Sequence, residues 1–498
     1  MHSPTSRREF LARSGVGMAS LALPTVQTHA VEGATANRRN IVFILTDDQR
    51  FDGMAVLGHP FLETPNLDAL AKGGVIFKKA FVATALCSPS RATILTGLYA
   101  HTHGVLDNST PLPASAPTFP QELQKGGYET AFVGKWHMGG QSDAPQPGFD
   151  RWVSFQGQGE YVGTTLNVDG KKVPQSGYIT DVLTDYAEEF LRKPREKPFC
   201  LCLCHKAVHA SFTPAPRHKG CYADKTYPHP ASMADTPENY KGKPAWVRAQ
   251  RNSWHGVDGM YAKQTDFDTF TRDYAETLRA VDDSVGRVVA TLKELGKLDS
   301  TLIVFTSDNG FLMGEHGLID KRCMYEPSIR VPLIVHCPEL FAGGATRDEM
   351  ILNTDYAPTF LEAAGCPIPS SMQGRSFYPL LEGKKIGWRD AFLYEYFWER
   401  SYPQTPTVQG IRTDRYKLMR FHGVWDRYEL YDLQEDPDEM NNLIGNIELT
   451  IEGGAIDNLI NDDTAPEIKA IFKQLTARLN ELVRETNGVP EPIWYKAR

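Results

Sequence analysis

The sequence predicts an α/β protein, with a large, mostly parallel sheet sandwiched by helices and a smaller C-terminal antiparallel sheet with a helix. Short, nearly continuous apolar runs alternate with helical segments over most of the chain, which is typical of a parallel sheet covered on both faces. After about residue 381 the pattern changes to short strand-like runs broken by turn residues, which indicates antiparallel pairing. The length of 498 residues also exceeds the roughly 250–300 residues at which a single core stops growing, so a smaller companion unit is expected.

The elements of the large sheet are expected to follow one another along the chain. Pro65 suits the first turn of a helix that Gly73 and Gly74 end, because proline fits a helix start and glycine fits its end. A long amphipathic stretch at residues 267–295 predicts another helix. The apolar runs interpreted as buried strands are residues 40–46, 130–134, 198–204, 301–306 and 331–336.

The C-terminal part has a different pattern of apolar and turn residues. A polar helix is expected at about residues 466–486. We place the large domain at residues 38–385 and the C-terminal subdomain at residues 386–498. The strands expected in this subdomain are residues 394–397, 410–413, 416–421 and 428–432.

Residues 1–30 are interpreted as an export signal. Arg7 and Arg8 precede a mildly apolar stretch at residues 14–24, and small residues follow at residues 28–30. This layout is typical of a twin-arginine signal, whose route carries folded proteins out of a bacterial cytoplasm. The alternative is a disordered tail with a chance arginine pair. We therefore expect export by the twin-arginine machinery, to the periplasm.

Composition excludes some classes of protein. A formal net charge of −8 gives no reason to expect nucleic-acid binding, which needs a basic face. Beyond the N-terminus, no run of about 18 apolar residues predicts a membrane span in the mature protein. The 8 cysteines form no zinc pattern and are sparse for a disulfide scaffold. Cys200, Cys202 and Cys204 alternate along an expected strand, so we interpret them as buried free thiols on one face.

Acidic residues end two of the expected strands. Asp47 and Asp48 follow the first strand, and Asp308 and Asn309 follow the strand that starts at residue 301. Adjacent carboxylates repel each other unless a cation or strong donors lie between them. Because the ends of parallel strands meet at one edge of a sheet, these oxygens predict a site for Ca²⁺ or Mg²⁺. Asp-Asn-Gly is also a common turn, which is the alternative for the second pair.

A cysteine motif, Cys87-Ser88-Pro89-Ser90-Arg91, carries the second chemical signal. Pro89 suits a first helical turn, so Cys87 is expected at or just before a helix N-terminus, which favours anions. Arg91 is then expected one turn into the helix, close to the same point. A thiolate of low pKa is one possible outcome of that placement.

This motif, with Ala92 and the run at residues 95–97, resembles the signature of the sulfatase family, in which the cysteine is converted to formylglycine. The resemblance extends over nearly the whole chain after the export signal and implies the alkaline-phosphatase-like fold of bacterial carbohydrate sulfatases. It also implies a maturation partner, either a formylglycine-generating enzyme or an anaerobic sulfatase-maturating enzyme. The metal ligands that it implies are Asp47, Asp48, Cys87, Asp308 and Asn309, with Ca²⁺ as the ion and Mg²⁺ as the alternative. The catalytic residues that it implies are Cys87, Arg91, Lys135, His137, His209 and Lys321, and the substrate-binding residues are Lys135, His209, His316 and Lys321.

The resemblance implies a mechanism for sulfate ester hydrolysis. Hydrated formylglycine at position 87 attacks sulfur, and His209, with or without Lys321, protonates the leaving alcohol. His137 then takes a proton from the second hydroxyl, which expels sulfate and restores the aldehyde. His205 lies close to His209 in the sequence, so the choice of His209 depends on the family spacing.

We expect a sulfated saccharide as substrate, because Gly-Glu-His-Gly followed by Asp-Lys-Arg resembles sulfatases that act on sugars; small aryl sulfates are a second possibility. Three further classes compete: a phosphate or phosphonate monoester hydrolase of the same fold, a cysteine hydrolase and a calcium-dependent glycan-binding protein. A cysteine hydrolase leaves both acidic pairs unexplained, and a phosphate dianion favours more metal or cation than the sequence offers. A segment that we expect to form a pocket wall, unless it packs inside a loop, contains Trp152, Phe155, Gln156, Gln158 and Tyr161.

Overall fold

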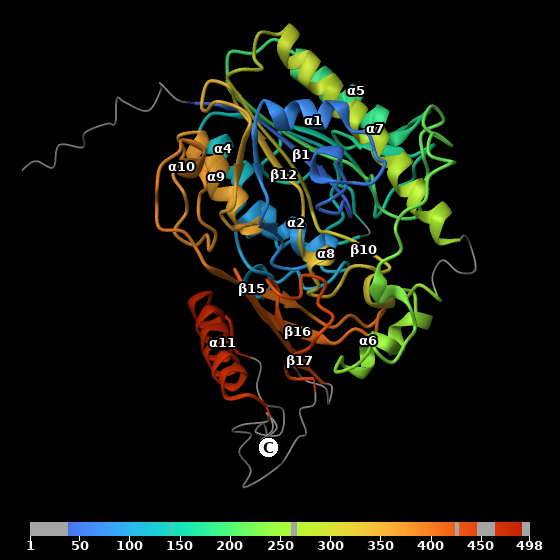
Figure 1. Cartoon of the computed structure of the whole chain (residues 1–498). Coiled ribbons are helices and arrows are strands. Elements are labelled where there is room, and N and C mark those ends of the chain that lie inside the picture. Colours follow the sequence, from blue (N-terminus) through green and yellow to red (C-terminus); the bar gives the residue numbers. More distant parts are fainter. Residues whose placement is uncertain (1–37, 141, 260–265, 424–427, 446–463, 491–498) are drawn as a thin grey trace, which may run out of the picture. The chain divides into compact units, whose positions relative to one another are not determined.

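A ten-stranded sheet lies at the centre of the computed structural model, which describes residues 38–140, 142–259, 266–423, 428–445 and 464–490 (Figure 1). The strand order is β13-β2-β12-β9-β1-β8-β4-β5-β6-β7. The strands from β9 to β5 in this order are parallel neighbours, whereas β12 and β6 run antiparallel to the strands beside them. The strand bounds are β1 Asn40–Thr46, β2 Val75–Phe77, β4 Glu129–Lys135, β5 Arg151–Phe155, β6 Thr165–Val168, β7 Lys171–Pro174, β8 Phe199–Cys204, β9 Thr301–Ser307, β12 Leu333–His336 and β13 Ala345–Arg347.

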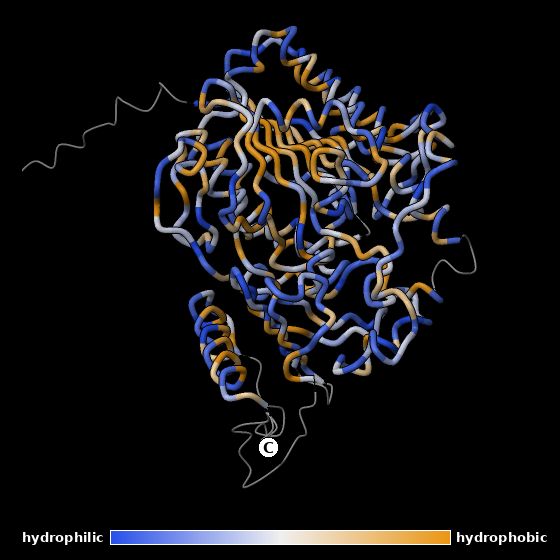
Figure 2. The backbone as a smooth tube through the Cα atoms, in the orientation of Figure 1, coloured by the Kyte–Doolittle hydropathy of each residue, from blue (hydrophilic) through white to orange (hydrophobic). Residues whose placement is uncertain are grey.

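Helices cover both faces of this sheet, because successive apolar side chains of β1 point to opposite faces and both must be buried. Ile41, Phe43 and Leu45 point into a core shared with α2 (Cys87–Thr96), α4 (Phe119–Lys125) and α9 (Tyr356–Ala363). Val42 and Ile44 point into a second core, shared with α1 (Pro65–Lys72), α5 (Ile179–Arg192) and α7 (Phe267–Glu294). Figure 2 shows the strands between these layers as the most hydrophobic part of the chain. The predicted fold, a mostly parallel sheet sandwiched by helices, is confirmed.

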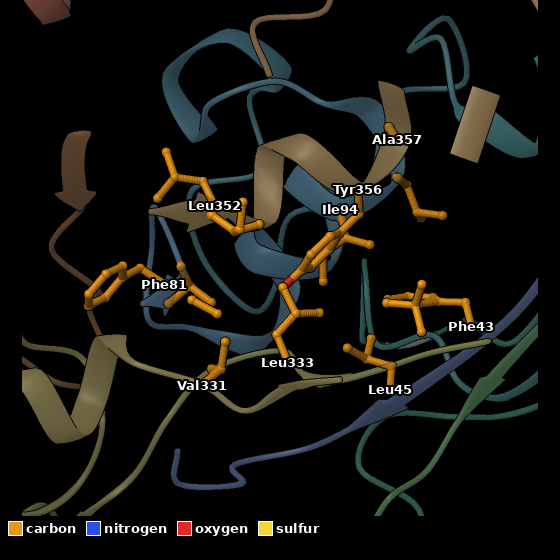
Figure 3. Packing of buried hydrophobic residues seen from close by; sticks show 14 of the residues in the cluster. Phe43, Leu45, Phe81, Ile94, Val331, Leu333, Leu352, Tyr356 and Ala357 are labelled. Atoms are coloured by element: carbon orange, nitrogen blue, oxygen red, sulfur yellow. The ribbon is translucent and has the colours of Figure 1, made fainter. Parts of the chain in front are cut away.

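The side chains between β1 and α9 show how tightly one of these cores is packed (Figure 3). The ring of Phe43 lies 5.9 Å from that of Tyr356 and 5.2 Å from that of Phe360, measured between centroids. On the neighbouring strand β8, Cys200, Cys202 and Cys204 face this core as buried free thiols, as predicted.

The C-terminal part forms the predicted antiparallel sheet, in the order β15-β16-β17-β18. These strands are β15 Ala391–Tyr396, β16 Thr407–Thr413, β17 Tyr416–His422 and β18 Tyr428–Asp432. Helix α11 (Pro466–Glu485) packs Leu475, Leu479 and Val483 against the side of this sheet that carries Leu393 and Ile411. The first two strands begin three residues earlier than predicted. Residues Asn37–Arg498 cluster as one compact unit, so the domain boundary at residue 385 stays a prediction.

Shorter elements connect these parts. Among the described residues, no helix combines the length and the apolar character that crossing a membrane requires. The expected export signal at residues 1–30 lies outside the described residues. The shorter elements are β3 Ala80–Phe81, α3 Ala100–His103, α6 Ala245–Ala249, β10 Leu312–Met313, β11 Ile319–Asp320, α8 Glu326–Ile329, β14 Ile351–Leu352 and α10 Tyr378–Leu381.

Replacing Phe43 tests the packing between β1 and α9. We expect Phe43→Ala to lower the free energy of unfolding by about 3–5 kcal/mol, because it removes a buried ring and leaves a cavity. Urea unfolding followed by tryptophan fluorescence measures the change. Val56→Ala is the control, since Val56 is 44% exposed and should change stability by roughly 0.5 kcal/mol or less. Equal effects of the two substitutions would contradict the proposed core.

Candidate functional site

The acidic residues predicted at the ends of β1 and β9 lie side by side. These strands are parallel neighbours with Thr46 opposite Ser307, so the residues that follow emerge at the same edge of the sheet. Carboxylate oxygens of Asp47, Asp48 and Asp308 all lie within 4.8 Å of one another. Asp48 has a positive φ of 59°, and its backbone N–H donates to Asp308 Oδ1 at 3.2 Å. Such a backbone conformation is uncommon outside glycine and often marks a functional site.

These oxygens fit a divalent cation. The Nδ2 group of Asn309 donates to Asp48 Oδ1 at 2.6 Å, but its buried Oδ1 has no hydrogen-bond partner among the described residues. Burial raises the pKa of Asp48 to about 7, and the nearby Asp47, Asp320 and Asp308 carboxylates add to this rise while Lys321 opposes it. An unpaired amide oxygen beside crowded carboxylates is the donor set that Ca²⁺ and Mg²⁺ prefer.

Arg91 holds two of these carboxylates in place. From the second turn of α2, its Nε donates to Asp308 Oδ2 at 2.9 Å and its Nη2 to Asp47 Oδ2 at 3.1 Å. Its Nη1 donates to the Lys135 carbonyl at 2.6 Å. Although burial opposes the charged form, Asp308 and Asp47 raise the pKa of Arg91 above its ordinary value. The guanidinium therefore links the ends of three strands, β1, β4 and β9, to α2.

Cys87 is the first residue of α2, as the motif predicted, and it is completely buried. Its Sγ lies 3.6 Å from Asp47 Oδ1, to which the thiol donates its only hydrogen bond to a described residue. Burial, followed by the Asp47 carboxylate, raises the pKa of the Cys87 thiol. These surroundings do not favour the low-pKa thiolate that was one of the expected outcomes.

Lys135 and His137 follow directly from the end of β4. A Cβ at Gly134 would lie 1.8 Å from the Cys204 carbonyl oxygen, so glycine allows β4 and β8 to approach closely here. The Lys135 ammonium, fully buried, donates to Asp47 and to Gln158 Oε1. His137 has a positive φ of 65°, and Ser88 Oγ donates to its carbonyl at 3.0 Å. Burial, with the Lys135 charge, lowers the pKa of His137 well below its ordinary value, so the imidazole is neutral.

His209 and Lys321 both lie beside Asp48. The Lys321 ammonium donates to both oxygens of Asp48 at 2.6 Å. His209 Nε2 is 3.9 Å from Asp48 Oδ2, whereas its Nδ1 is 2.6 Å from the Ala210 carbonyl oxygen. Nδ1 therefore carries the donated proton and Nε2 faces the carboxylates. Burial, with Lys135 and Lys321, lowers the pKa of His209.

The structure separates His209 from its neighbour in the sequence, His205. His205 is buried beneath α7, where its Nε2 lies 3.2 Å from Ser284 Oγ. Within the described part of the chain it forms no ion pair with the carboxylates of the site, whereas His209 approaches Asp48. His209 is therefore the histidine that the geometry places at the site.

Other predicted residues lie apart from this centre. His316 is buried against Tyr325, with ring centroids 4.2 Å apart, and forms no hydrogen bond or ion pair with the other predicted site residues, all of which the structure describes; its role in substrate binding stays a prediction. Trp152 and Phe155 are buried packing residues, which is the alternative that the sequence left open. Of the expected pocket wall, Gln158 contacts Lys135, and the Tyr161 hydroxyl donates to the His209 carbonyl at 2.7 Å.

Sequence reasoning missed Ser88 and Lys206. Ser88 lies inside the cysteine motif, next to residue 87, but nothing in its spacing indicated that its hydroxyl supports His137. Lys206 is buried between His205 and the turn that carries His209. The available signal for Lys206 was its position two residues after the end of an apolar strand, where burial is expected. Lysines are rarely buried without a partner, so a lysine there indicates a binding role.

Comparison with known families and sequences gives a consistent result. A family model described as "Sulfatase" matches residues 39–366, and one described as "N-sulphoglucosamine sulphohydrolase, C-terminal" matches residues 314–452. The chain is 37% identical over 475 residues to the N-acetylglucosamine-6-O-sulfatase of Bacteroides thetaiotaomicron, covering 82% of this chain and 83% of that protein. It is 31% identical over 408 residues to the Extracellular sulfatase SULF-1 homolog of Drosophila melanogaster, covering 77% of this chain but 35% of that longer protein.

A solved structure is similar over almost its whole length. It is a complex with the substrate D-glucosamine-2-N,6-O-disulfate, with a TM-score of 0.82 and 33% sequence identity. The match covers 90% of this chain and 98% of that chain.

Titration with calcium tests the oxygen site. We expect Ca²⁺ to raise the thermal-unfolding midpoint of chelator-treated protein, because the ion relieves the repulsion between the carboxylates. Asn309→Ala should weaken Ca²⁺ binding by roughly 10-fold or more, since it removes a ligand oxygen. Isothermal titration calorimetry measures the affinity, and Asn441→Ala, at an exposed position, is the control. An unchanged affinity in Asn309→Ala would exclude Asn309 as a ligand.

Proposed function

Because the chain belongs to the sulfatase family, we propose that it removes 6-O-sulfate from N-acetylglucosamine or glucosamine residues of sulfated saccharides. The chain is a sulfuric ester hydrolase that acts on sulfated carbohydrate. The observation that supports the proposal most directly is the position of Cys87, buried at the N-terminus of α2 beside Asp47 and between buried cations. The 6-O position and the glucosamine ring are suggested by the named relative and by the ligand of the similar structure.

A sulfate monoester carries negative charge on its non-bridging oxygens, which repels an incoming nucleophile. Lys135 pairs with Asp47 and Lys321 with Asp48, and both would add positive charge near the bound sulfate. Each nitrogen of the Arg91 guanidinium donates to a protein oxygen, on Asp47, Asp308 or the Lys135 carbonyl. We therefore assign it to holding the carboxylates, not to contacting the ester.

Two groups that the family uses would complete the centre. A Ca²⁺ ion held by Asp47, Asp48, Asp308 and Asn309, with residue 87, would stabilise negative charge on the ester; Mg²⁺ is the alternative. Formylglycine made from Cys87, once hydrated, would supply an oxygen nucleophile. Asp47 Oδ1, which accepts the hydrogen bond from Cys87, is placed to accept one from that group as well.

The two histidines divide the proton transfers. His209 Nε2 faces the Asp48 side of the centre, and once this nitrogen has taken up a proton it would protonate the departing alcohol. The Lys321 ammonium, which donates to Asp48, already carries its proton and is the alternative donor. His137 is neutral and therefore suited to accept a proton near residue 87, and Ser88 fixes its backbone.

We also propose that the protein is exported, by way of a twin-arginine signal at residues 1–30, to the periplasm. A formylglycine-generating or anaerobic sulfatase-maturating enzyme would act on Cys87 before export. The Drosophila relative named an extracellular sulfatase is consistent with a role outside the cytoplasm.

The geometry favours a sulfatase over a cysteine hydrolase, although Cys87 Sγ, a His209 ring nitrogen and an Asp47 oxygen lie within 4.8 Å of one another. The Cys87 thiol donates to a carboxylate, not to a histidine base, among the described residues, and burial raises its pKa. A cysteine hydrolase would also leave the cluster of Asp47, Asp48 and Asp308 without a use.

The mass of the tryptic peptide of residues 80–91 tests the nucleophile. In protein from its own host we expect a loss of about 18 Da, because an aldehyde oxygen replaces the elements of hydrogen sulfide. Cys87→Ala should abolish release of sulfate from N-acetylglucosamine 6-sulfate, whereas Cys221→Ala, at an exposed cysteine, should not. An unmodified thiol in protein that still hydrolyses the ester would overturn this mechanism.

Replacing His209 tests the assignment of the acid. We expect His209→Ala to lower kcat for N-acetylglucosamine 6-sulfate by about 10²–10⁴-fold, because a sugar alkoxide leaves poorly without a proton. The loss for 4-nitrophenyl sulfate should be much smaller, since nitrophenolate leaves without protonation. His229→Ala, at an exposed histidine, is the matched control. Equal losses on both substrates would show that His209 is not the acid.

A further inference from the structure

Lys206 is a buried cation without a counterion. The residue is only 4% exposed, yet its ammonium donates no hydrogen bond and forms no ion pair with any residue that the structure describes. Its Nζ instead lies 4.6 Å from the centroid of the Tyr161 ring. An ammonium whose described partner is an aromatic face is less well stabilised in a largely buried residue than one that bonds to oxygen.

The other deeply buried lysines all have oxygen partners. Lys135 donates to Asp47, Lys321 to Asp48 and Lys417 to Glu439. Lys243 donates to the Tyr431 hydroxyl and to a backbone carbonyl. Lys206 therefore differs from its counterparts in lacking a group that compensates its charge.

Lys206 belongs structurally to the candidate site. Its carbonyl accepts the backbone N–H of His209 at 3.0 Å, and the Tyr161 ring beside its ammonium belongs to the side chain that bonds the His209 carbonyl. Burial lowers the pKa of Lys206 to about 8, and the nearby Lys135 charge adds to this effect. The carboxylates whose fields act on Lys206 are Asp47, Glu160 and Asp48.

Two buried ammonium groups close to each other repel unless an anion lies between them. Lys135, proposed above to bind the sulfate, follows Gly134, which lies opposite Cys204 in the parallel pair of β4 and β8. Lys206 follows Cys204 by two residues, so both lysines leave the sheet at the same edge. An oxyanion bound there would give Lys206 the partner that it lacks and would offset the repulsion by Lys135.

We propose that Lys206 binds a non-bridging oxygen of the substrate's sulfate group, together with Lys135. This inference rests on the proposed sulfatase function and adds a substrate-binding residue to the predicted set. Because the sulfate keeps its negative oxygens from the ester to the free ion, Lys206 contacts substrate, transition state and product alike. Such uniform binding lowers KM and strengthens product inhibition but leaves kcat nearly unchanged.

Lys206→Met tests the proposal, since methionine keeps much of the apolar stem and removes the charge. We expect roughly 10–100-fold weaker binding of inorganic sulfate and a similar rise in KM for N-acetylglucosamine 6-sulfate, because a charge-assisted hydrogen bond is lost. The value of kcat should stay within about 3-fold. Lys206→Arg should retain most of the affinity. Lys473→Met, which removes a charge from the exposed face of α11, is the control.

Inorganic sulfate binding, measured by isothermal titration calorimetry and as product inhibition, separates this proposal from the proposed function. Weaker sulfate binding in Lys206→Met, with recovery in Lys206→Arg, supports the role of Lys206 even if the wild-type protein prefers another ester. The role of Lys206 is overturned if Lys206→Met binds sulfate as tightly as wild-type protein does, provided that the wild-type protein hydrolyses the sulfate ester. If Lys206→Met shows a lowered thermal-unfolding midpoint, Lys206→Gln replaces it, and the same comparison with Lys206→Arg decides.

Discussion

Mutual repulsion among the buried carboxylates beyond β1 and β9 is the constraint on which the rest of the site depends. Carboxylate oxygens of Asp47, Asp48 and Asp308 lie within 4.8 Å of one another, so each carboxylate needs a positively charged partner from elsewhere in the fold. Arg91 on α2, Lys135 at the end of β4 and Lys321 after β11 meet this need. The elements that carry the chemistry are therefore fixed to the sheet edge by the same charges that a substrate and a cation would meet.

The sequence predicted the fold where burial alone determines structure. The central strands are apolar throughout because both of their faces pack against helices, and this continuous pattern was readable at β1, β8 and β9. The antiparallel direction of β12 was not readable, since a buried strand looks alike in either direction. The early start of β15 was missed although Ala391, Phe392 and Leu393 are apolar and buried. The early start of β16, at Thr407, depends on pairing with β15 and β17.

The site residues that belong to a sequence motif could be predicted, whereas contacts that depend only on the three-dimensional arrangement could not. The acidic strand ends and the cysteine motif predicted that Asp47, Asp308 and Cys87 lie together, and the structure brings both Cys87 and Asp308 close to Asp47. Nothing in the sequence spacing indicated that the Arg91 guanidinium donates to two carboxylates or that Lys206 is buried beside Tyr161. Lys206 also adds a cation near the site that the motifs did not reveal, so charge alone does not separate sulfate from phosphate esters here.

The burial of Cys87 has a consequence for the order of events in biosynthesis. In the folded chain the thiol is sealed at the start of α2 and bonded to Asp47, out of reach of any other protein's active site. Under the proposed mechanism, an oxidising enzyme would therefore have to reach this residue while the strand ends and α2 are still apart. Maturation would then compete in time with folding, because a chain that folds first keeps the thiol enclosed. The time available would depend on how fast β9 joins β1, since Asp308 follows Asp48 by 260 residues.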